Sequence, residues 1–148
     1  MGNFAFWQRW LVAVSVLVAV GGLGITLLAG TSIFDTVFDN QINPVFWDTR
    51  TTTPETEDFQ KWVYGILGAT MTGWGIMLGF IAYYPFKTRE KWAWTGITTG
   101  LVVWFIIDST VSLLFGVTFN ALAVNLPIFR LALLPLLATY PDFFGRRP

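Results

Sequence analysis

Asp108 and Arg130 are ionisable residues that lie inside stretches of sequence that are otherwise apolar. A charge inside a membrane-spanning segment is costly and usually faces a partner, a cavity or a functional path. At about 1.5 Å per residue, Asp108 lies about 12 Å and Arg130 about 18 Å from the outer ends of their helices. The two helices run in opposite directions, and helical side chains lean toward their own N-terminus. The spacing therefore predicts that Asp108 and Arg130 converge to form an ion pair.

Several uncharged polar residues, including Ser112 and Asn125, surround the expected pair, and Pro127 removes a backbone hydrogen bond nearby. We therefore expect a small polar site within the membrane. Two interpretations remain open. The pair is either a structural clamp between two helices or a site for a lipid headgroup, an anion at Arg130 or a transported proton at Asp108.

Trp74 and Trp104 fall near mid-membrane, where no water is available to the indole N–H. Packing opposite small residues is one explanation for them, because large aromatic side chains fill the space that glycines leave. The alternative is that they face a bound ligand.

The composition excludes several classes of protein. The chain has no His and no Cys, which removes the commonest general base and the thiolate nucleophile. Nine basic residues balance nine acidic ones, so no basic surface for nucleic acid is expected. No glycine-rich phosphate-binding motif occurs, and the spans hold only one carboxylate where a metal would need several. We expect no cofactor and no metal.

The 148 residues are 54% hydrophobic and only 12% charged, which indicates a membrane protein. Apolar runs at about 7–29, 62–84, 92–115 and 118–139 are long enough to cross a bilayer and predict four transmembrane helices. The second helix is expected over 54–84, with its first two turns in the outer aqueous layer. The first run is longer than the apolar part of a signal peptide, so we interpret it as a retained helix. The expected fold is a single membrane domain over 1–148, an all-α antiparallel four-helix bundle.

The loop 30–53 between the first two spans is too apolar to be a simple tether. Its apolar residues recur at helical spacing, which predicts a short amphipathic helix at the membrane surface that ends at Pro44. Thr53 is the expected N-cap of the next helix, with Pro54 in its first turn.

The basic residues of the loops predict the orientation. Six fall on one side of the expected membrane: Arg9, Lys87, Arg89, Lys91, Arg146 and Arg147. Only Arg50 and Lys61 fall on the other, among six acidic residues. The positive-inside rule then places both termini in the cytoplasm of a multi-pass protein, and we expect the bacterial inner (plasma) membrane.

Small residues at four-residue intervals predict where the helices pack, because close backbone approach favours association in lipid. The expected packing residues are Gly65, Ala69 and Gly73 on the second span and Gly96 and Gly100 on the third. They place the second helix at the centre of the bundle, and they also suit an oligomer face.

We expect a non-catalytic protein, either an accessory or scaffold subunit of a larger membrane complex or a lipid-binding bundle. Its partners would be membrane lipids and other membrane subunits, or further copies of itself. The alternative is a small transporter or proton-coupled carrier centred on Asp108 and Arg130. An enzyme acting on a lipid has less support, because the spans offer only Asp108 as acid or base.

Overall fold

The computed structural model describes residues 3–145, and every regular element in that range is helical. The elements are α1 (Phe4–Leu28), α2 (Ser32–Phe34), η1 (Asp35–Asp39), α3 (Asn40–Trp47), α4 (Pro54–Tyr83), α5 (Lys91–Leu114), η2 (Asn120–Asn125) and α6 (Leu126–Phe144). The segments η1 and η2 are π-helical. Helices α1, α4 and α5, and η2 with α6, are each long and apolar enough to cross a membrane, as the sequence predicted.

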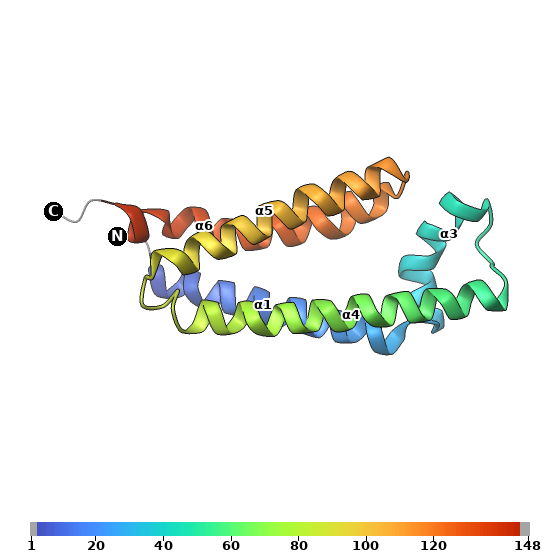
Figure 1. Ribbon diagram of the computed structural model, residues 1–148, viewed down its shortest axis with the longest axis horizontal. Coiled ribbons are helices and arrows are strands. Elements are labelled where there is room, and N and C mark those ends of the chain that lie inside the picture. Colours follow the sequence, from blue (N-terminus) through green and yellow to red (C-terminus); the bar gives the residue numbers. More distant parts are fainter. Residues whose placement is uncertain (1–2, 146–148) are drawn as a thin grey trace.

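The four long helices form two antiparallel pairs (Figure 1). α1 lies along α4, and η2 and α6 fold back along α5. Among the described residues, the pairs touch through α1 with α6, and α4 contacts α5 far less than it contacts α1. The central position expected for α4 is therefore wrong: α4 uses one face against α1 and does not join the two pairs.

We call the end with the α4–α5 turn the basic end, because Arg9, Lys87 and Arg89 lie together there and Lys91 begins α5. The opposite end, with the segment 30–53, is the acidic end. Arg146 and Arg147, which also entered the orientation argument, lie outside the described residues.

The seam between α1 and α4 consists of small residues. A Cβ on Gly22 would meet the Gly68 carbonyl oxygen at 2.6 Å, and one on Gly75 would collide with the backbone of Ala19. Thr72 Oγ1 donates to the Ala19 carbonyl across the seam at 3.3 Å. The helices are therefore close enough for a side chain to reach the neighbouring backbone, which is how small residues bring membrane helices together.

The residues predicted to pack do not form the close contacts of this seam, although the Gly65 carbonyl borders it and accepts from Thr26 Oγ1 of α1 at 3.2 Å. A Cβ on Gly65, Gly73, Gly96 or Gly100 would meet nothing within 4 Å, and Ala69 is exposed. α4 carries several overlapping runs of small residues, and the seam uses the one through Gly68 and Gly75. Spacing identified the type of contact but not which of these runs makes it.

The apolar core lies at the basic end, where all four long helices meet. Its fully buried members are Leu11, Ala82, Phe86, Ala93 and Leu136. The ring of Phe86 stands 4.7 Å from that of Phe143 on α6 and 6.0 Å from that of Phe4 on α1. These contacts join the two pairs.

Polar contacts at the basic end satisfy carbonyls that prolines leave free. Pro135 has no N–H for the Leu131 carbonyl, and Trp10 Nε1 of α1 donates to that oxygen at 2.9 Å. Beside Pro85, the Phe86 N–H bonds to the Ile81 carbonyl, and Gln8 Nε2 reaches the adjacent Ala82 carbonyl at 2.9 Å. Side chains of α1 thus compensate for irregularities in α4 and α6.

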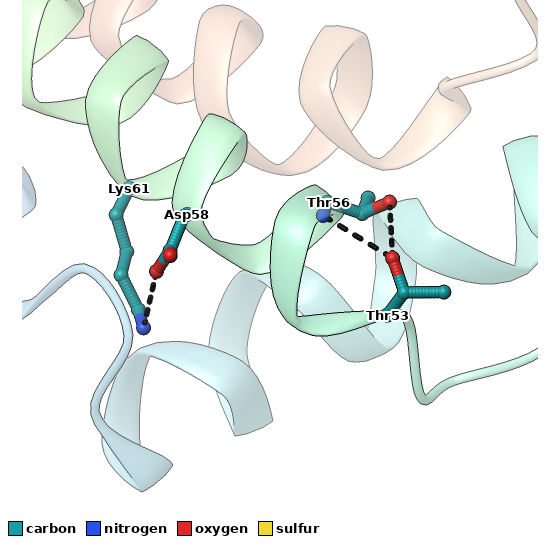
Figure 2. A network of polar contacts seen from close by, with 4 residues as sticks. All are labelled: Thr53, Thr56, Asp58 and Lys61. Atoms are coloured by element: carbon teal, nitrogen blue, oxygen red, sulfur yellow. Dashed lines mark hydrogen bonds and ion pairs between the residues drawn. The ribbon is translucent and has the colours of Figure 1, made fainter.

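At the acidic end, Thr53 begins α4 as predicted (Figure 2): its Oγ1 accepts from the Thr56 N–H at 3.4 Å. One turn later, Lys61 Nζ lies 3.5 Å from Asp58 Oδ1. The helix predicted before α4 is present but does not end at Pro44. It continues to Trp47, where Asp48 adopts a left-handed conformation with φ 54°.

The segment from α2 through η1 to α3 (residues 32–47), called the α2–α3 segment below, contacts both helix pairs. The Phe34 ring lies 4.8 Å from that of Tyr64 on α4, and the Phe38 ring lies 6.0 Å from that of Phe119 at the start of the last span. It therefore bridges the pairs at the acidic end, where the long helices themselves diverge (Figure 1).

Candidate functional site

Asp108 is the centre of a polar cluster between α5 and η2. Its Oδ1 accepts from Asn125 Nδ2 at 2.7 Å, Asn120 Nδ2 at 2.8 Å and Ser112 Oγ at 3.3 Å. Asn120 Nδ2 also lies 2.8 Å from Ser112 Oγ. Ser112 and Asn125 are buried, and Asp108 is half-buried. We call these four residues the Asp108 cluster.

The π-helical turn η2 explains how two asparagines reach one carboxylate. Asn120 and Asn125 are five residues apart, about one turn of a π-helix, so they share a face. In an α-helix, at about 3.6 residues per turn, they would point about 140° apart. The turn lies just before Pro127, whose ring clashes with regular α-helical backbone. π-helical turns occur frequently at functional sites.

The predicted ion pair between Asp108 and Arg130 does not form. Among residues 3–145 the ion pairs are Lys61 with Asp58 and Arg89 with Asp142. Arg130 is exposed, and it lies two residues, about 200° of helical rotation, from buried Ala132. The sequence argument used depth and the lean of side chains along the helix axis but not rotation about the axis. The π-helical turn changes that rotation and places Asn125 opposite Asp108.

The two mid-span tryptophans do not join the cluster. Trp74 is 48% exposed on α4, and Trp104 is half-buried on α5. In the described part of the chain neither indole N–H donates a hydrogen bond, whereas Trp10 and Trp94 donate to carbonyls of α6. The structure therefore brings together Asp108, Ser112 and Asn125 of the predicted site, and leaves Arg130, Trp74 and Trp104 apart from them.

A second polar cluster, at the acidic end, was not predicted. Tyr64 OH donates to Asp39 Oδ1 at 2.9 Å, and Gln60 Nε2 donates to Asn43 Oδ1 at 2.7 Å. Asn43 Nδ2 in turn donates to the Arg50 carbonyl at 3.1 Å. Asp39, Asn43 and Gln60 are buried, so these contacts fix the α2–α3 segment on α4.

The sequence signal for this cluster was two pairs at i, i+4 spacing: Asp39 with Asn43, and Gln60 with Tyr64. Each pair occupies one helix face. In the amphipathic helix expected from the sequence, Asp39 and Asn43 lie off the apolar face. Instead they face α4. Burial raises the pKa of Asp39, and the nearby charges of Asp35 and Glu57 act in the same direction, while the Tyr64 hydrogen bond opposes them.

The chemistry available in these clusters is hydrogen bonding and proton exchange at single carboxylates. Within residues 3–145, His, Cys, Asp and Glu form no group of three that could hold a metal ion. The chain matches no protein-family model, and no curated protein or solved structure shows a significant similarity to it.

Proposed function

We propose that the protein is a non-catalytic, multi-pass membrane protein that acts as an accessory or scaffold subunit by binding another transmembrane helix. The observation that supports this most is a set of glycines at which an added Cβ would point into open space. Gly65 and Gly73 on α4 and Gly96 and Gly100 on α5 face open space, at spacings of eight and four residues.

The α1–α4 seam supports this proposal, because α4 already packs against a neighbouring helix there through Gly68 and Gly75. Another helix would approach the uncovered glycines by the same physics, since lipid gives little hydrophobic drive and close backbone contact must supply the attraction. Exposed Arg130 adds a second reason. An arginine within a span requires a polar or acidic neighbour, and none of the described ion pairs includes it.

The test is purification in a mild detergent or in native lipid discs, followed by native mass spectrometry. We expect a stoichiometric partner subunit or a defined oligomer, lost when Gly73→Leu fills the uncovered face. Ala13→Leu on α1 is the matched control, because it adds bulk at an exposed position that is not one of the open glycines.

Retention of the partner by Gly73→Leu and by Gly96→Leu would contradict helix binding through these faces. A particle that contains one chain alone would contradict the subunit assignment altogether.

The second candidate is a proton-coupled carrier centred on Asp108, with Arg130 as an anion contact. It is favoured by the finding that uncharged donors, and not an arginine, hold this carboxylate within a predicted span. The test is proton and solute flux into liposomes that contain the protein. Flux abolished by Asp108→Asn and preserved by Arg9→Gln supports a carrier, and flux equal to that of empty liposomes contradicts it.

A further inference from the structure

The basic end holds a pocket that the proposed function does not use. It has a volume of about 540 Å³, within the range of about 300–1,000 Å³ typical of small-ligand sites. The start of α1, the end of α4 and the turn 85–90 form it. Its walls include Phe4, Gln8, Arg9, Tyr83, Lys87 and Arg89.

Three of these residues are cations, and no carboxylate lines the pocket. Lys87 Nζ stands 5.4 Å from the centre of the Tyr83 ring, and the Arg89 guanidinium lies 4.5 Å from that of Phe4. Arg89 is also 3.7 Å from Asp142, which neutralises part of its charge. Within residues 3–145, Arg9 and Lys87 form no ion pair, so the pocket keeps a positive charge.

The rest of the wall is fixed and partly apolar. Gln8 is buried, and its amide donates to the Ala82 carbonyl at 2.9 Å, which ties α1 to α4 at this position. Phe4 and Val12 supply apolar surface next to the charges. A cationic pocket beside apolar helix surface, at the end of membrane-spanning helices, suits a ligand with an anionic head and an apolar body.

We propose that this pocket binds a phosphate group, with Arg9 and Lys87 as its main charged contacts. The phosphate belongs either to an anionic phospholipid or to a free soluble anion. The lipid is favoured by the apolar wall. This inference does not rest on the subunit assignment, because it uses no residue of the uncovered glycine faces.

The experiment is native mass spectrometry of the full-length protein, released from vesicles of phosphatidylglycerol and phosphatidylcholine in equal amounts. We expect selective retention of phosphatidylglycerol. The double variant Arg9→Gln with Lys87→Gln should weaken its binding about 25-fold, or about fivefold for each cation removed. Lys91→Gln is the matched control: it lies at the same end, over the Phe144 ring, and does not line the pocket.

Titration with inorganic phosphate separates the two sources. Retained phosphatidylglycerol that millimolar phosphate does not displace identifies the lipid, whereas phosphate that binds alone and displaces the lipid identifies a soluble anion. The proposal is overturned if neither binds, or if Lys91→Gln weakens binding as much as the double variant. Exchange of the two cations, Arg9→Lys with Lys87→Arg, should preserve binding. Loss of binding in that variant would mean that the two side chains are structural.

Discussion

At the scale of single residues, Asn125 has the largest role in holding Asp108, because it is buried and makes the shortest hydrogen bond to the carboxylate. Replacing it with Ala leaves that oxygen with one strong donor fewer. Hydrogen bonds between membrane helices are worth about 1–2 kcal/mol in model systems. We therefore expect Asn125→Ala to destabilise the fold by about 1–2 kcal/mol in thermal or denaturant unfolding in detergent.

Arg130→Gln is the control for this prediction, since Arg130 takes no part in the Asp108 cluster. The stability of the Arg130→Gln variant should be close to that of the unmodified chain. The exchange of Asp108→Arg with Arg130→Asp should not recover stability lost in Asp108→Arg. Recovery would show that the two residues are paired after all.

Asp39 makes a pH-dependent contribution at the acidic end. Its pKa is raised above the ordinary value of 3.8, so the folded state favours the protonated carboxyl. This stabilisation of the folded state is complete below the pKa that Asp39 has in the unfolded chain. It is lost as the pH rises through the higher pKa that Asp39 has in the folded state. We expect the unfolding temperature to fall with pH across that window, and Asp39→Asn to remove this step.

Tyr64→Phe gives an independent check of the sign. The tyrosine hydroxyl favours the charged carboxylate, so its removal should raise the pKa of Asp39 further and extend the window to higher pH. A shift of the window to lower pH would contradict this account of the Asp39 environment.

At the scale of elements, α1 is joined to α6 by an indole that replaces a missing backbone donor. Trp10→Phe removes the bond to the Leu131 carbonyl, and we expect a loss of about 1 kcal/mol, the usual net value of a hydrogen bond. Trp7→Phe is the control, because the Trp7 indole makes no hydrogen bond within the described chain. The two variants are compared by unfolding followed with far-ultraviolet circular dichroism, which does not depend on tryptophan fluorescence.

A Pro135→Ala background tests whether the Trp10 indole N–H stands in for the missing backbone donor. In that background the alanine N–H is able to bond to the Leu131 carbonyl within α6. The effect of Trp10→Phe should then shrink toward that of Trp7→Phe. An unchanged effect would mean that Trp10 acts through packing alone.

The sequence predicted elements better than their contacts. Hydropathy located all four long apolar helices, and Thr53 and Pro54 marked the start of α4, because these signals are local. The partner of Asp108 depends on helical rotation, and the π-helical turn before Pro127 alters that rotation without an unambiguous signal. The choice between Gly65–Gly73 and Gly68–Gly75 likewise depends on Ala19 and Gly22, which are distant in the chain.

At the scale of the whole molecule, the segregation of charge predicts how the chain crosses a membrane. We expect the basic end in the cytoplasm. The chain has no Cys, so single cysteines report on each side without interference. In intact cells, a membrane-impermeant thiol reagent should label Thr51→Cys, and it should label Thr88→Cys only after permeabilisation. Both threonines are exposed in the structure. The opposite labelling pattern would invert the proposed orientation.

The division of the molecule into two pairs also sets an order for its synthesis. Every residue of the α1–α4 seam precedes residue 84, so that pair is complete as soon as α4 has left the ribosome. Gln8 can then already bond to the Ala82 carbonyl, whereas Trp10 has its acceptor, the Leu131 carbonyl, only after α6 has been made. During synthesis the N-terminal part of a chain generally folds first. The α1–α4 hairpin is therefore complete first, and the second hairpin is joined to it at the basic end once α6 has been made.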